Sequence, residues 1–373
     1  MNETKQTPSA FLSLLPLVVL VLMLVATIRA YGSDSLAGAS QVTLLVVSAF
    51  CVLLGTQFLK VPWAEFEQAI TRNVSSVTSA ILILLFIGAL SGTWMVSGVV
   101  PSLIYYGMKI IHPEVFLTST CLISALVSVM TGSSWTTIAT IGIALMGIGR
   151  AQGFDDGWIA GAIISGAYFG DKISPLSDTT VLASGGVGVP LFKHIRYMMI
   201  TTFPSLLIAL AIFTIAGFTH ESTTGNEVFL FSAALSSRFN ITPWLLLVPI
   251  ITGIMIARRF PPVVTLFMST LIAVVFALIF QPEVLSEIAE GNLFKGAMQS
   301  IYGSTSVSTH SPMLTSLVAT RGMAGMMNTI WLIICAMCFG GAMEAGGMVR
   351  GITQIFVRMI HGRVSLVAST VCS

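Results

Sequence analysis

One polar stretch decides the fold, namely Gly170-Asp171-Lys172-Ile173-Ser174-Pro175-Leu176-Ser177-Asp178-Thr179-Thr180. It brings two carboxylates, one ammonium group, four hydroxyls and a proline together, between apolar segments that run from Trp158 to Phe169 and from Val181 to Phe192. The whole chain is 55% hydrophobic and only 9% charged. Because charged residues make up about a quarter of an ordinary globular chain, too few are present to cover a soluble surface. We therefore predict an all-α, polytopic membrane protein that holds this polar segment within the bilayer.

Seven apolar runs approach the length of roughly 20 residues that a membrane-spanning helix needs. They are continuously apolar and lack the alternation, with a period of two, that marks a barrel strand. The first run is longer than the apolar part of a signal peptide, so we interpret it as a spanning helix. The runs cover residues 11–28, 42–59, 80–100, 198–218, 243–257, 263–280 and 326–343, and a further apolar region, 115–191, is interrupted by polar residues.

The basic residues indicate the orientation, because loops rich in Lys and Arg stay in the cytoplasm. Placing the basic loops inside gives one consistent topology, with the N-terminus in the cytoplasm and Lys109 as the exception on the outer side. The loops assigned to the outside carry acidic residues such as Glu283 and Glu287. The basic residues assigned to the inside are Lys60, Arg72, Lys193, Arg196, Arg258, Arg259, Arg350, Arg358 and Arg363.

Two parts of the chain resemble each other. Residues 71–98 align with 320–346, and the match continues from 106–112 to 356–361. By the charge rule the first copy starts inside and the second outside, which predicts an inverted-repeat secondary transporter with discontinuous helices. The first repeat would cover 1–196, a linking helix and outer loop 197–242, and the second, inverted repeat 243–373. The second copy lacks a counterpart of 170–180, so we expect it to be truncated: the chain is either a fragment or a transporter with a single broken-helix element.

Two polar breaks are predicted at membrane depth. The first is Thr131-Gly132-Ser133-Ser134-Trp135-Thr136-Thr137, where Gly132 lets the chain leave helical geometry. Non-helical backbone at this depth is tolerated where it is buried or lines a watery cavity. The alternative is a helix–helix contact rich in small residues.

The second break is the opening stretch, where Pro175 disrupts the helix and frees backbone carbonyls near residues 170–173. Hard cations prefer oxygen ligands, so we predict a Na⁺ site at Asp171 and Asp178. Lys172 is the expected charge partner when the cation is absent, and one aspartate would bind a proton or a cation in turn. A solvated cytoplasmic loop is the alternative. The candidate hydroxyl ligands from both breaks are Ser174, Ser177, Thr179, Thr180, Thr131, Ser133, Ser134, Thr136 and Thr137.

Two further ionisable residues stand near apolar segments. Glu344 is expected near the cytoplasmic end of its helix, either lining an access path or lying at the surface. His310 falls in a polar outer stretch and is either a pH sensor or a solvated loop residue. The glycines form no phosphate-binding loop, so ATP-driven transport and a nucleotide cofactor are not expected.

Taken together, the two breaks resemble the NhaC family of sodium/proton antiporters. The resemblance is carried by the string 170–180, by Ile163-Ile164-Ser165-Gly166-Ala167-Tyr168-Phe169 before it, by 131–137, and by Ile301-Tyr302-Gly303-Ser304-Thr305. It implies a multi-pass protein of the prokaryotic inner membrane that moves sodium out against protons. It also brings in relatives that exchange sodium and lactate for protons and malate. Family members usually extend further at the C-terminus, with a second polar broken-helix motif.

We therefore expect a secondary antiporter, not an enzyme, whose substrates are Na⁺ and H⁺ and which needs no cofactor. The alternative is sodium-coupled exchange of organic acids, with the substrate carboxylate bound by Lys172 or by the backbone amides around 133–136. A passive channel or a scaffold is the third interpretation. The partners are the two ions and the lipid bilayer, with no nucleic acid, and a homodimer is left open.

Overall fold

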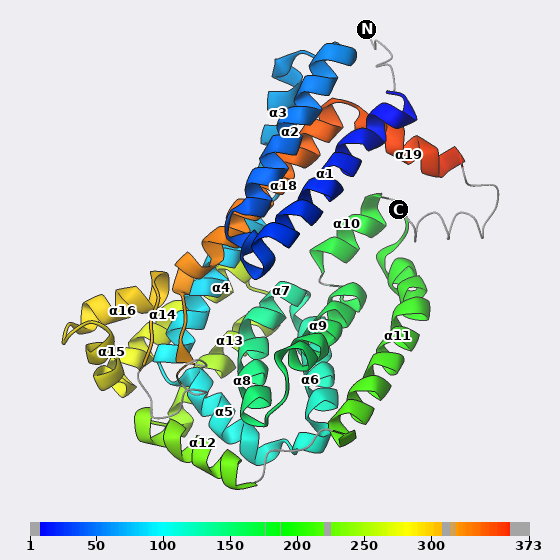
Figure 1. Ribbon diagram of the computed structural model, residues 1–373. Coiled ribbons are helices and arrows are strands. Elements are labelled where there is room, and N and C mark those ends of the chain that lie inside the picture. The colour runs from blue at the N-terminus through cyan, green and yellow to red at the C-terminus, as the bar shows by residue number, and fades with distance from the viewer. Residues whose placement is uncertain are drawn as a thin grey trace. The chain divides into compact units, whose positions relative to one another are not determined.

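The computed structural model describes residues 8–175, 177–186, 188–219, 225–307, 315 and 318–358. These residues form helices, and the sole extended pairing among them joins Thr305 to Thr320 (Figure 1). Seven of the described helices are long and apolar enough to cross a membrane, and a bent pair of helices would make eight. The prediction of an all-α, polytopic membrane protein is confirmed.

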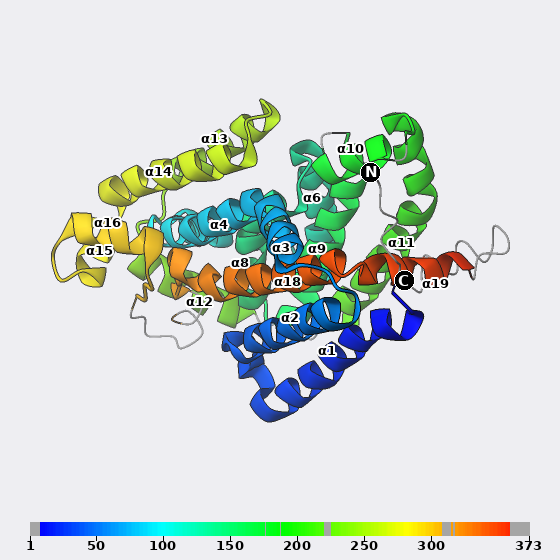
Figure 2. The ribbon, with the colours of Figure 1, turned by 90° about the horizontal axis from the view of Figure 1, so that it is seen from above.

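The chain divides into two compact units, residues 1–82 with 327–373 and residues 83–326. In the first unit, α2 (Ala39–Phe58) packs against α1 (Ala10–Tyr31) and α18 (Met327–Ala345) (Figures 1 and 2). The unit also contains the turn η1 (Gly32–Ala37), α3 (Trp63–Ser76), the start of α4 (Thr78–Val96) and α19 (Met348–Arg358). Its core gathers Cys51, Phe66, Ala342 and Met348.

Helix α3 is amphipathic and was not expected, because the search for spans considered only continuous apolar runs. It buries Phe66 and Ala69 and packs against α18. The approach is so close that a methyl group on Gly341 would lie 2.7 Å from the Ile70 Cα atom. Glu344 on α18 accepts hydrogen bonds from Arg72 (2.6 Å) and Asn73 (2.8 Å) of α3. Glu344 therefore ties two helices together in this unit, and the access path proposed for it gains no support.

The second unit contains the remainder of α4 and the helices that carry both predicted breaks. Its core includes Trp94, Phe116, Ile159 and Leu266. The elements are α5 (Val99–Ile110), η2 (Pro113–Val115), α6 (Phe116–Thr131), α7 (Ser134–Thr137), the π-turn η3 (Ile138–Gly142), α8 (Ile143–Ala151), α9 (Asp156–Ile173), α10 (Asp178–Gly186), α11 (Leu191–Thr219), α12 (Gly225–Arg238), η4 (Pro243–Leu246), α13 (Leu247–Ala257), α14 (Pro262–Phe280), α15 (Pro282–Ile288), α16 (Leu293–Tyr302) and η5 (Gly322–Met326).

Two of the predicted spans differ from the structure. The run 80–100 is not one helix, because Gly98 adopts φ +79° between α4 and α5. The run 243–257 begins with the turn η4 and continues as α13, and this segment is bent by 93° from the end of α12. Apolar composition alone did not reveal either bend. The inverted repeat and its boundaries stay a prediction. The division into two compact units does not test them, because it describes which residues pack together and not whether two segments share one fold.

Candidate functional site

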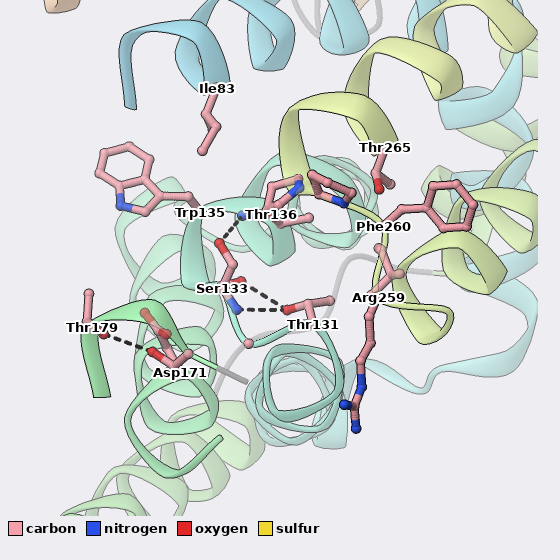
Figure 3. A pocket seen from close by; sticks show the side chains of 15 residues that line it. Ile83, Thr131, Ser133, Trp135, Thr136, Asp171, Thr179, Arg259, Phe260 and Thr265 are labelled. Atoms are coloured by element: carbon pink, nitrogen blue, oxygen red, sulfur yellow. Dashed lines mark hydrogen bonds between the residues drawn. The ribbon is translucent and has the colours of Figure 1, made fainter. Parts of the chain in front are cut away.

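A cavity of about 370 Å³ lies in the second unit, where the two predicted breaks meet the turn between α13 and α14 (Figure 3). The first break contributes Thr131, Gly132, Ser133, Trp135 and Thr136, and the second contributes Asp171, Ser177 and Thr179. The α13–α14 turn contributes Arg259, and α14 contributes Thr265. The residues that line the cavity therefore include one aspartate, one arginine and several serines and threonines.

The first break forms as predicted from Gly132. This residue ends α6 with φ +68°, and its N–H donates to the Ser128 carbonyl at 2.8 Å. Ser133 then caps α7, because its hydroxyl accepts the Thr136 N–H at 3.2 Å. The Thr131 hydroxyl accepts the Ser133 N–H at 3.1 Å. Side chains thus take over backbone bonding that the broken helix has lost.

The second break depends on Pro175, which lacks an N–H and so leaves the Asp171 carbonyl without its helical donor. The Thr180 hydroxyl lies within hydrogen-bonding distance of the carbonyls of Asp171 (3.3 Å) and Lys172 (3.2 Å). The Gly170 carbonyl still accepts the Ser174 N–H at 3.0 Å. The predicted freeing of carbonyls near residues 170–173 is therefore wrong for Gly170, whereas the Asp171 carbonyl loses its helical donor and is approached by the Thr180 hydroxyl.

Close packing of α9 on α6 sets the position of Asp171. Gly166 and Gly170 share one face of α9, and a methyl group on either would lie 2.1 Å from the Cys121 carbonyl oxygen or 2.5 Å from that of Ala125. The Ser128 hydroxyl donates to the Ala167 carbonyl at 2.5 Å. Small residues four apart allow two helices to approach this closely, and Gly170 lies directly before the carboxylate residue Asp171.

The two breaks meet at one hydrogen bond. The Ser134 hydroxyl donates to Asp171 Oδ2 at 2.8 Å, although the residues are far apart in the sequence. Hydrogen bonds to an ionised group are roughly twice as strong as those between neutral groups. This contact orients the carboxylate at the wall of the cavity.

Comparison with known proteins identifies the family. A family model described as the Na⁺/H⁺ antiporter family matches residues 1–167 and 166–373. The chain belongs to the Na⁺/H⁺ antiporter family. The predicted resemblance to NhaC-type antiporters is confirmed, because the antiporter is 36% identical to the Na⁺/H⁺ antiporter NhaC of Alkalihalophilus pseudofirmus over 88% of this chain and 70% of that protein.

Other relatives of the antiporter have names that state other cargoes. A malate-2H⁺/Na⁺-lactate antiporter of Bacillus subtilis is 35% identical over 88% of this chain and 69% of its own length. An arginine/ornithine antiporter of Halobacterium salinarum is 32% identical over 93% of this chain and 69% of its own length. Membership of this family therefore shows that the protein is an antiporter. Because the names of the relatives state different substrates, the transported substrate has to be inferred from the chemistry of the cavity.

The predicted ligands of the antiporter separate into two groups. Those that line the cavity are Thr131, Ser133, Thr136, Asp171, Ser177 and Thr179, together with Gly132. The others support the breaks: Ser174 is buried and donates to the Val129 carbonyl at 2.8 Å, and Thr137 donates to the Ser133 carbonyl at 3.0 Å. Thr180 satisfies carbonyls of α9, and Ser134 holds Asp171.

Of three further predicted residues, Lys172 does not join this arrangement, and the side chains of the other two lie outside the described part of the chain. The Lys172 side chain is exposed, and within the described part of the chain no ion pair joins it to Asp171. Asp178 is the first residue of α10, but its side chain lies outside what the structure describes, and so does His310. The cation that lines the cavity of the antiporter is Arg259.

Sequence reasoning used Arg259 only for orientation and missed Thr265 altogether. A buried network positions both: the Trp94 indole donates to Ser269 at 3.0 Å, and Ser269 bonds Thr252 at 2.7 Å, which joins α4, α13 and α14. Arg259 has φ +60° and follows the C-cap of α13, with its N–H donating to the Ile256 carbonyl at 2.8 Å. In the sequence, the sign of this role was that Thr265 is a polar residue inside the apolar run 263–280.

Two hydroxyls at the cavity have no partner among the described residues. Thr136 is 2% exposed and Thr265 is fully buried, and neither Oγ1 atom makes a hydrogen bond there. A buried hydroxyl without a partner costs about 1–3 kcal/mol. Both residues line the cavity that also holds Asp171. The two Oγ1 atoms are themselves buried, so a side-chain rotation would be needed to turn either oxygen toward the cavity.

Proposed function

We propose that the protein exchanges Na⁺ for H⁺, with Asp171 as the residue that binds either ion. The observation that supports this most directly is the Ser134–Asp171 hydrogen bond, which brings the two broken helices to one carboxylate beside a polar cavity. Membership of the Na⁺/H⁺ antiporter family supports the same cargo.

The chemistry of the lining favours a hard cation. The cavity offers carboxylate and hydroxyl oxygens, and no histidine or cysteine is among its lining residues within the described chain. Such ligands suit alkali cations better than transition metals. The partnerless hydroxyl of Thr136 lies in the same break as Ser134 and would be a further oxygen for the ion after a side-chain rotation.

Exchange follows if the two ions compete for one carboxylate. An ionised carboxylate away from bulk water needs a counter-charge, so Asp171 would cross the membrane bound either to Na⁺ or to a proton. The empty, charged form would be disfavoured during the transition. Sodium moving one way and protons the other would then be coupled, without any cofactor.

We further propose that the protein lies in a prokaryotic inner membrane with its N-terminus in the cytoplasm. The orientation rests on Arg258 and Arg259, which place the α13–α14 turn inside by the charge rule. Because Arg259 lines the cavity, the cavity would open toward the cytoplasm. The homodimer that the sequence left open is testable by the mass of the protein in detergent.

The test is sodium-driven proton movement in proteoliposomes that contain a pH-sensitive dye. A sodium gradient should change the internal pH with the wild-type protein and not with Asp171→Asn. Glu67→Gln is the control, because Glu67 is an exposed residue of α3 and does not line the cavity. Full exchange by Asp171→Asn would refute the assignment, and Asp178→Asn tests the second predicted aspartate separately.

Sodium-coupled exchange of organic acids is the second candidate, and Arg259 is the observation that favours it. A guanidinium group binds carboxylates well, and 370 Å³ would hold about ten water molecules, far more than one sodium ion requires. A relative named as a malate-2H⁺/Na⁺-lactate antiporter agrees with this alternative. Sodium-dependent uptake of labelled malate would establish it, and its absence alongside sodium/proton exchange would exclude it.

A further inference from the structure

A second cavity, of about 500 Å³, lies in the same unit. Its walls come from α4, α8, α9 and the segment 319–326. They are mainly apolar, with Met146 and Ile163 as examples, and two guanidinium groups, those of Arg150 and Arg321, line it. None of its lining residues belongs to the Asp171 cavity.

Helices α4 and α9 each line both cavities. The order of the lining residues along each helix shows on which side of the unit each cavity lies. On α4, Ile83 lines the Asp171 cavity and Ser91 lines the second one. On α9 the order is reversed, with Ile163 at the second cavity and Asp171 at the first. At a rise of about 1.5 Å per residue, each pair is separated by roughly 12 Å along its helix. The cavities thus lie at opposite ends of two helices that run in opposite directions.

The first break continues directly from one cavity to the other. Thr136 lines the Asp171 cavity, and Ile138 and Gly142 line the second. Between them, Thr137, Ala139 and Thr140 are all at least 96% buried. This stretch includes the π-turn η3, a rare geometry that is frequent at functional sites. Buried residues of this stretch therefore lie between the two spaces along the chain, and no residue lines both.

We propose that the second cavity is the outer vestibule of the transport path and a low-affinity release site for the cation. The geometry assigns it to the side opposite the Asp171 cavity, and the release role rests on the proposed Na⁺/H⁺ exchange. It holds no carboxylate ligand among its lining residues. The Arg150 guanidinium is held by Asp156 through contacts of 2.6 and 2.7 Å.

Among the described residues, Arg321 therefore supplies the charge of the vestibule that has no ion-pair partner. Within the described residues it forms no ion pair, and it is exposed at the cavity. A fixed positive charge lowers the local concentration of cations. Sodium that reaches this space would leave it more readily than it returns, which favours export over re-entry.

Cysteine accessibility tests the geometry without requiring transport, so it is informative even if sodium/proton exchange is refuted. In a cysteine-free background, Ile83→Cys and Ser91→Cys place single thiols on α4 at the two cavities. Leu90→Cys is the control, because Leu90 is fully buried. A membrane-impermeant maleimide should label the two cavity positions from opposite sides of the membrane and the control from neither. Labelling of Ser91→Cys from the same side as Ile83→Cys, or from neither side, would overturn the vestibule.

Inhibition of sodium export by external Na⁺ tests the role of the charge. Arg321→Gln should lower the external Na⁺ concentration that halves export by about two- to fivefold, whereas Arg321→Lys keeps the charge and should behave like the wild type. Equal inhibition of the Gln and Lys variants would overturn the release role and leave the geometric assignment to the labelling experiment.

Discussion

The substitution Gly170→Ala tests whether close packing of α6 and α9 positions the carboxylate. The added methyl group would lie 2.5 Å from the Ala125 carbonyl oxygen, 2.5 Å from Ser128 Cβ and 2.7 Å from the Val129 nitrogen. Ordinary contacts of this kind are 3.4–4 Å, so the two helices must separate by about 1 Å. Two of these three neighbouring atoms belong to the backbone and cannot rotate away. We expect a loss of about 1–3 kcal/mol in stability from this overpacking.

The same displacement reaches the site. Asp171 is the next residue, and its 2.8 Å hydrogen bond from Ser134 spans the two helices that would separate. A misplacement of about 1 Å in a working site can lower its rate as much as a hundredfold. We therefore expect sodium-driven proton exchange by Gly170→Ala to fall at least about tenfold, even in protein that remains folded.

Gly161→Ala is the matched control on the same helix. A methyl group there would lie 3.9 Å from the Phe213 ring, which is ordinary contact. Alanine is a better helix former than glycine by about 1 kcal/mol, so this variant should be as stable as the wild type or more so. Thermal unfolding in detergent and proton flux in proteoliposomes measure both effects. If Gly170→Ala unfolds and transports like Gly161→Ala, the packing argument is wrong.

Three further substitutions test other parts of the structure. Thr265→Val removes a buried hydroxyl without a described partner. In the absence of sodium, the variant should therefore be as stable as the wild type or about 1 kcal/mol more stable. Its half-maximal exchange should need a higher Na⁺ concentration. A variant that is less stable than the wild type would contradict this reasoning. Thr180→Val removes the donor to the Asp171 carbonyl and should cost about 1 kcal/mol in thermal unfolding, and no change would show that the second break does not need it. Glu344→Gln loses an exposed ion pair, which is worth at most about 1 kcal/mol, and added salt should remove the difference from the wild type.

The family and the location of the two breaks were predictable because they depend on local properties of the chain. The interruptions at Gly132 and Pro175 have local causes, since glycine readily adopts left-handed backbone and proline lacks an N–H. The apolar runs likewise reveal membrane helices without any tertiary contact. Amphipathic α3 escaped prediction because its apolar residues are periodic and not continuous.

The composition of the cavity was not predictable, because it depends on which side chains the tertiary structure brings together. Lys172 is next to Asp171 in the sequence, but successive helical residues point about 100° apart, and Lys172 is exposed. Arg259 and Thr265 line the cavity only because the Trp94–Ser269–Thr252 network holds α13 and α14 near α4.

The pattern of amino acids is enough to predict a helical membrane protein in which two breaks supply the oxygen-rich residues of the candidate site. The hydrogen bond from Ser134 to Asp171, and the two separate cavities that α4 and α9 each line, follow from the tertiary structure and not from the pattern. The physical reason is the range of the interactions. Helix formation and breakage are governed within a few residues, whereas a site requires atoms from distant segments to approach within about 3 Å.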